Sequence, residues 1–118
     1  MKSYSPGARF DGASFKNSDL SSSDLAGAVF HAARFVGSQL HKVSAAGADF
    51  SATEVMESVF DEANLRNATF KHAQLTKTTF KGASCQGADF QGAHGPDLLP
   101  LAPSEWGVCL ATAIMGRG

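Results

Sequence analysis

The sequence lacks the features that mark a membrane or secreted protein. None of its apolar runs approaches the roughly 20 residues that a transmembrane helix needs. The first six residues, MKSYSP, also lack the apolar stretch of a signal peptide. We therefore expect a cytoplasmic protein without a membrane segment.

Neither sign of charge is in excess. Ten Lys and Arg residues stand against eleven Asp and Glu residues, which gives a net charge of −1. A protein that binds the DNA backbone usually carries a surplus of bases, so this balance argues against DNA as a partner. The length of 118 residues fits one domain.

Cysteine is scarce as well. Cys85 and Cys109 are the only two, and no CxxC or Cys/His spacing of a zinc site surrounds them. We expect buried thiols in a reducing compartment, with a disulfide between the two as the open alternative. Cys85 falls on an inward position of the pattern described next, so we expect a core residue rather than a nucleophile.

The sequence does contain a repeat of five residues. Large apolar residues recur at the multiples of five from 10 to 90, and all nine Phe residues are among them. The residue two positions earlier is small throughout, from Ala8 to Ala88, and Val43 is the largest of these. The periods of a helix and of a strand both drift out of phase with five. A chain that turns a corner in every five would point both residues inward.

The large residues also follow a longer period of twenty. One series with this spacing consists only of phenylalanines: Phe10, Phe30, Phe50, Phe70 and Phe90. A coil made of four fives would stack such a series directly along the molecule. The sequence therefore predicts a solenoid with four sides.

Several segments resemble the A(D/N)LXX motif of the pentapeptide-repeat family. Examples are residues 48–52 (ADFSA), 63–67 (ANLRN) and 88–92 (ADFQG). The resemblance covers seventeen consecutive fives, from about residue 8 to residue 92. It implies an all-β fold, a right-handed quadrilateral β-helix of about four coils.

The repeat stops near residue 96. An apolar linker with two prolines occupies residues 97–103, and Ser104 is a suitable N-cap for a helix whose apolar stripe includes Trp106 and Ile114. A solenoid needs caps, because its last coil exposes apolar side chains and unpaired backbone. We predict a β-solenoid over residues 1–96, followed by a linker and a C-terminal capping helix over residues 97–118.

Catalysis finds little support in the residues. The spacing of twenty brings Ser21, His41, Asp61 and Lys81 into one outward series that resembles a relay. These neighbours would be exposed, however, and no pocket would shield them from water. Phe and Leu fill the inward positions and leave no room for a substrate. We expect no enzyme, no catalytic residue, no cofactor and no metal.

The outward positions supply the candidate binding residues. The spacing of twenty puts Val36 next to Met56, and an adjacent apolar pair on a surface is a candidate docking spot for a protein. The same spacing pairs Arg34 with Glu54, Lys42 with Glu62, and Glu57 with Lys77. The candidate partner-binding residues are Val36, Met56, Arg34, Glu54, Trp106 and Ile114.

Two functions fit this pattern. The first is a non-enzymatic scaffold for an unknown protein partner, with a homodimer through a solenoid end or the C-terminal helix as a further possibility. The second comes from the resemblance: pentapeptide-repeat proteins of the quinolone-resistance kind mimic DNA and bind a type II topoisomerase, DNA gyrase. The acidic stretch from Glu54 to Glu62 is followed by a basic stretch from Arg66 to Lys81, which departs from such mimicry. A fragment of a larger bacterial protein is another alternative, because the family also supplies appended domains.

Overall fold

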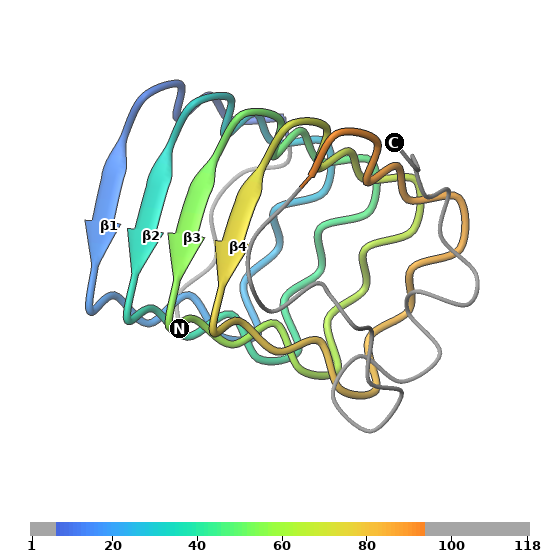
Figure 1. Ribbon diagram of the computed structural model, residues 1–118. Helices are drawn as coiled ribbons and strands as arrows, with labels where there is room; N and C mark the ends of the chain where they lie inside the picture. Colours follow the sequence, from blue (N-terminus) through green and yellow to red (C-terminus); the bar gives the residue numbers. More distant parts are fainter. Residues whose placement is uncertain (1–6, 94–118) are drawn as a thin grey trace.

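The computed structural model describes residues 7–93, which wind into a four-sided β-helix (Figure 1). One coil takes twenty residues, since Ser14 pairs with Arg34 and Arg34 with Glu54. The coils advance from β1 to β4 in a right-handed sense (Figure 1). No helix occurs within the described residues. The predicted all-β, right-handed, quadrilateral fold is confirmed, whereas the linker and capping helix of 97–118 lie outside the described part.

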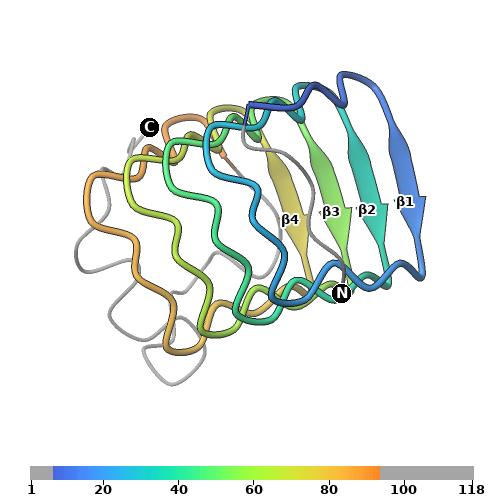
Figure 2. The ribbon, with the colours of Figure 1, turned by 180° about the vertical axis from the view of Figure 1, so that it is seen from behind.

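One side of the coil forms regular strands. These are β1 (Ser14–Lys16), β2 (Arg34–Val36), β3 (Glu54–Met56) and β4 (Gln74–Thr76), which form a parallel sheet in that order. The other three sides, seen from behind in Figure 2, are joined by isolated parallel bridges such as Asp24 with Ser44. Every side therefore pairs with the same side of the next coil.

The residues at multiples of five fill the interior, as the period predicts. Phe30, Phe50 and Phe70 are fully buried, and their rings stack with centroids 5.0 and 4.8 Å apart. The stack extends to Phe10 on one side and Phe90 on the other. Stacked aromatic rings add about 0.5–1.5 kcal/mol per pair to the burial of their surface. The core is thus a ladder of rings that continues from coil to coil.

The two ends of the described solenoid differ in burial. Phe15 in the first coil is half-buried, and so is Phe10. In the last described coil, Phe80 is fully buried and Phe90 is 1% exposed. Cys85 lies in this coil at its predicted inward position, also 1% exposed, but it is disulfide-bonded rather than a free thiol. Cys109 lies outside the described residues.

Corners are made by the residue two positions after each large one. All eighteen such residues from Gly7 to Gly92 have positive φ, and eight of them are glycine. Glycine adopts this conformation without steric penalty, which explains why glycine gathers at these positions. A Cβ at Gly37 would also lie 2.6 Å from Oδ1 of Asn17 in the preceding coil, a contact that a rotation of the Asn17 side chain would relieve.

The Asp or Asn of the motif has a local role. The Oδ1 atom of Asp49 accepts a hydrogen bond of 2.8 Å from the backbone N–H of Ser51, and Asp89 accepts one of 2.9 Å from Gln91. Such bonds are typical of Asx turns. The acidic or amide residue before the large one therefore satisfies an N–H at the corner that follows.

The corner after each strand is built differently. At the other corners a backbone bond closes the turn, as from Ala48 N to Ala45 O. After β2 and β3 the hydroxyls of Ser38 and Ser58 make the hydrogen bonds at the corner instead. Ser58 Oγ donates to Met56 O at 3.0 Å and accepts from Ser38 N at 3.1 Å. The equivalent residues Ser18 and Thr78 also carry hydroxyls that bond to backbone carbonyls. A series of hydroxyls thus replaces the turn bond along this edge.

Candidate protein-binding face

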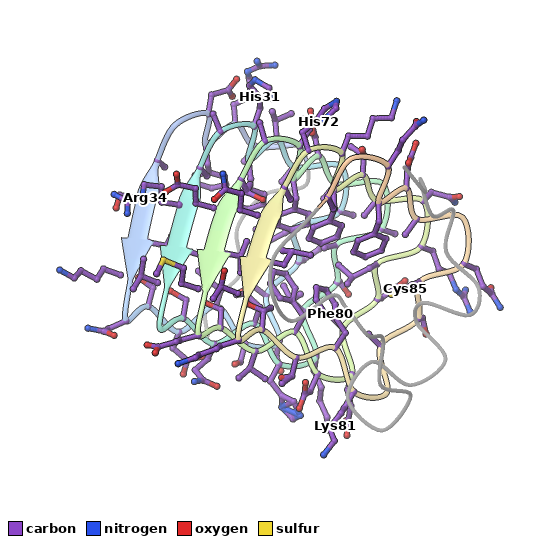
Figure 3. All side chains as sticks on the ribbon, in the orientation of Figure 1. His31, Arg34, His72, Phe80, Lys81 and Cys85 are labelled. Atoms are coloured by element: carbon purple, nitrogen blue, oxygen red, sulfur yellow. The ribbon has the colours of Figure 1, made fainter. Side chains whose placement is uncertain are left out.

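The outward side of the four-stranded sheet carries four of the predicted site residues. It is called the β1–β4 face below (Figure 3). Alternation along a strand turns the first and third residues outward while the middle one enters the core. The face consists of Ser14, Lys16, Arg34, Val36, Glu54, Met56, Gln74 and Thr76.

The predicted apolar pair is present on the two middle strands of this face. Val36 and Met56 are direct register partners in β2 and β3. Met56 is 41% exposed, and among the described residues no other large apolar side chain is exposed to this degree. Val36 is half-buried, so the expectation that both residues are exposed holds fully only for Met56. The exposed side chain of Met56 therefore lies next to the half-buried side chain of Val36.

A charged pair lies beside the apolar one. The Nε atom of Arg34 is 2.9 Å from Oε1 of Glu54, as the spacing of twenty predicts. Both side chains are about half exposed, at 56% and 47%. An exposed ion pair of this kind contributes about 0–1 kcal/mol to stability. Its charges therefore remain available to a partner at small cost to the fold.

The remaining predicted pairs are realised in part. Lys42 Nζ lies 3.9 Å from Oε1 of Glu62, and Nε2 of His41 lies 3.8 Å from the same oxygen. Glu57 and Lys77 face the solvent, and they are not among the ion pairs within residues 7–93. This third pairing is the one that the spacing predicts and the geometry lacks.

The outward series at His41 does not form a relay. Asp61 accepts hydrogen bonds from the Thr79 hydroxyl at 2.7 Å and from the Lys81 backbone N–H at 3.1 Å. His41 approaches Glu62 instead. Asp61 therefore supports the backbone of the following coil.

A second outward group was missed by the sequence reasoning. Nδ1 of His31 lies 2.9 Å from Oγ of Ser51, and that hydroxyl donates to Oδ1 of Asp49. Nucleophilic catalysis requires the imidazole to accept the serine proton, whereas here the carboxylate accepts it. The spacing of twenty between residues 31 and 51 could have revealed the contact. Within residues 7–93, no three His, Cys, Asp or Glu side chains come together in a way that could hold a metal ion.

One surface carboxyl shows a shifted pKa. The Ser21 backbone N–H donates to Oδ1 of Asp19 at 3.0 Å, and this bond, together with the Ser21 side chain, lowers the pKa of Asp19. Asp19 is exposed, and the shift comes from a local turn. It therefore does not mark a catalytic site.

Charge alternates from coil to coil. Residues 27–46 hold two bases and no acid, residues 47–66 hold five acids and one base, and residues 67–86 hold three bases and no acid. Because the coils stack directly, acids in the middle coil lie between bases on both sides. No side of the described solenoid carries charge of one sign along its length.

Two of the predicted binding residues, Trp106 and Ile114, lie outside the described part. Within residues 7–93, the structure contains no helix with the length and apolar character needed to cross a membrane.

The geometry defines the class of this molecule as a quadrilateral β-solenoid built from five-residue units. The family model for the pentapeptide repeat region matches residues 8–90, and the chain therefore belongs to the pentapeptide-repeat family. The resemblance found in the motifs is thus confirmed. No curated protein sequence matches the chain significantly.

Solved structures support the same conclusion about the fold. HetL, a pentapeptide repeat protein involved in regulating heterocyst differentiation in the cyanobacterium Nostoc sp. strain PCC 7120, is 28% identical with a TM-score of 0.70. The match covers 75% of this chain and 41% of HetL, so the chain spans about two fifths of that protein. A pentapeptide repeat protein from the cyanobacterium Cyanothece 51142 matches at 12% identity and a TM-score of 0.50, over 75% of this chain and 84% of its own.

A structure of QnrB1, a plasmid-mediated fluoroquinolone resistance protein, also matches. Its identity is 17% and its TM-score 0.41, over 78% of this chain and 58% of its own. A likeness at this level carries no argument about function.

Proposed function

We propose that this chain is a non-enzymatic scaffold that binds another protein through the β1–β4 face. The observation that carries the proposal is the exposed Met56 beside Val36 on the two middle strands of a four-stranded sheet. Exposed apolar groups with a polar surround are typical of protein interaction sites. A rigid solenoid also loses little conformational entropy on association.

The filled interior favours binding over turnover. Phe, Leu and other apolar side chains, with a few Ser and Thr, occupy the inward positions between residues 20 and 90 and are almost fully buried. The polar groups that lie together, such as His31 with Ser51, are exposed on the outside. Catalysis needs a site that excludes water around the reacting groups, and neither location supplies one.

The charge pattern disfavours the DNA-mimic alternative. A mimic of the DNA backbone needs acids that continue along one surface. In this chain the acidic coil of residues 47–66 lies between two coils whose charged residues are all basic. Strong inhibition of gyrase supercoiling by the purified protein would nevertheless overturn the scaffold proposal in favour of topoisomerase binding.

A double variant tests the proposed face. Val36→Asp with Met56→Asp adds two charges to the outward side and should leave the fold intact, while capture of a host partner by the tagged protein falls at least about tenfold. The matched control is Ala26→Asp with Ala46→Asp, because these residues are also twenty apart, partly exposed and located on a different side.

The outcome depends on which variant loses the partner. Loss with the face variant and retention with the control supports the proposal. Equal capture by wild type and face variant would contradict it. If variants at Trp106 and Ile114 then lost the partner, the C-terminal region would be the binding site.

A further inference from the structure

We propose that the β1–β4 face pairs with the same face of a second copy of this chain in a weak, two-fold symmetric dimer. The long axes of the two solenoids run in opposite directions in this dimer. This inference rests on the proposed function, since it identifies a partner for the same site. It is carried by the arrangement of apolar and charged residues in β2 and β3, which is complementary to itself.

The complementarity appears when a two-fold axis runs parallel to the strands, midway between β2 and β3, in the plane between the two faces. This rotation keeps the position along each strand and reverses the order of the strands. Val36 then faces Met56 of the second copy, and Met56 faces Val36. Arg34 likewise faces Glu54 of the second copy, and the reverse holds too. A two-fold interface consists of such reciprocal contacts.

The outer strands fit the same arrangement. With this axis β1 faces β4 of the second copy, which sets Lys16 against Thr76 and Ser14 against Gln74. None of the four strand pairs brings like charges together. The apolar pair and the charged pair therefore share the two middle strands, and Ser14, Lys16, Gln74 and Thr76 occupy the outer strands.

Other positions of the axis lose this match. An axis along β3 would set Glu54 against its own copy, and an axis along β2 would do the same to Arg34. Like charges that face each other in an interface are unfavourable by several kcal/mol. The charges thus favour the axis between β2 and β3. With this axis, each of the four strands faces a strand of the second copy.

The size of the face limits the strength of the dimer. Four strands about 4.8 Å apart and three residues of about 3.3 Å each give roughly 200 Å² per copy before the corner side chains are included. Stable interfaces bury about 800 Å² per partner. We therefore expect a dissociation constant between about 10 µM and 1 mM, so that the dimer forms reversibly as the concentration rises.

Two charge reversals test the register. The Arg34→Glu chain carries acids at both central charged positions of the face, and the Glu54→Arg chain carries bases at both. In the proposed dimer each variant repels its own copy, so self-association should weaken at least about tenfold. An equimolar mixture should restore association, because acids then face bases in both halves. Ser44→Asp, an exposed change on a different side, serves as the control and should associate as the wild type does.

Sedimentation velocity between about 10 µM and 1 mM measures these effects. The expected result is a sedimentation coefficient that rises with concentration for wild type, control and mixture, and stays at the monomer value for each reversal alone. Circular dichroism verifies that both reversal variants remain folded. A monomeric wild type at 1 mM, or wild-type association that neither reversal weakens, would overturn the inference.

Failure of this inference is distinguishable from failure of the proposed function. If purified wild type stays monomeric while the Val36 and Met56 double variant loses a host partner, the face binds a different protein and only the dimer is wrong. If the double variant neither loses a partner nor changes self-association, both proposals fail.

Discussion

At the residue scale, the corners store strain that stacking must outweigh. Ten of the eighteen corner residues are not glycine, yet all have φ between 50° and 63°. An L-residue in this conformation costs about 1–2 kcal/mol relative to the right-handed region. Asn tolerates it best because its side chain bonds locally, whereas Ala has no such compensation. Replacement of Ala32 or Ala52 by glycine should therefore relieve strain and stabilise the protein.

We predict that Ala52→Gly stabilises the protein by about 0.5–1 kcal/mol, since relief of strain exceeds the entropy that glycine adds to the unfolded chain. Ala52 has a φ of 59°. Urea unfolding monitored by circular dichroism measures the change. The control is Ala68→Gly at a buried inward position outside the positive-φ set, which should destabilise. A loss of stability at Ala52 would contradict the strain argument.

At the element scale, the ring ladder and the hydroxyl series hold neighbouring coils in place. Phe50 stacks on Phe30 at 5.0 Å and on Phe70 at 4.8 Å, with interplanar angles of 3° and 10°. Removal of this ring would leave a cavity between two rigid coils that cannot collapse easily. The cost of such a cavity adds to the lost burial.

We therefore predict that Phe50→Ala destabilises the protein by about 3–5 kcal/mol. Phe15→Ala should cost clearly less, because Phe15 is half-buried in the first coil. Chemical denaturation of both variants tests the comparison. A loss below about 1 kcal/mol at Phe50 would show that the inward register is wrong.

The hydroxyl series gives a second prediction at this scale. Ser58→Ala removes the acceptor for the buried Ser38 N–H and should cost about 1–3 kcal/mol, the desolvation penalty of an unpaired polar group. Ser44→Ala, at an exposed position, should change stability by less than about 0.5 kcal/mol. Equal losses in the two variants would remove any special role for this corner.

The sequence predicted the directions of side chains better than their contacts. A period of five sets which residues point inward, and a period of twenty sets which residues stack, so the Phe series and the Arg34–Glu54 pair followed from spacing alone. Contacts that depend on rotamers did not follow. Glu57 and Lys77 stay apart, and His41 turns to Glu62. The hydroxyl series was visible as four Ser or Thr residues at intervals of twenty, but its role required knowledge of which corners lack a backbone bond.

At the scale of the whole molecule, the open end of a solenoid is the place where other chains can add. Residues 97–118 are predicted from the sequence to cap the last coil, where Phe80 and Phe90 are buried. An uncapped coil would expose apolar rings and unpaired backbone, both of which promote edge association.

We predict that, in reducing buffer that keeps the cysteines of both chains as thiols, deletion of residues 97–118 lowers thermal stability and causes association through the uncovered coil. Light scattering and thermal unfolding of the truncated and full chains measure both effects. A truncated chain that remains monomeric and equally stable would show that this segment is not a cap. Association through the coil end should persist in the Arg34→Glu variant, which separates it from the proposed face-to-face dimer.

The sequence of this molecule has two periods, a unit of five residues and a coil of twenty. The inward pattern depends on the period of five, because each unit supplies one large and one small inward residue. The arrangement of the surface depends on the period of twenty, because residues twenty apart become neighbours on the same side of adjacent coils. Insertion of one unit between β2 and β3 would keep the core pattern but move Met56 a quarter turn away from Val36. An insertion of five residues could therefore change which outward residues are neighbours while every unit keeps one large and one small inward residue.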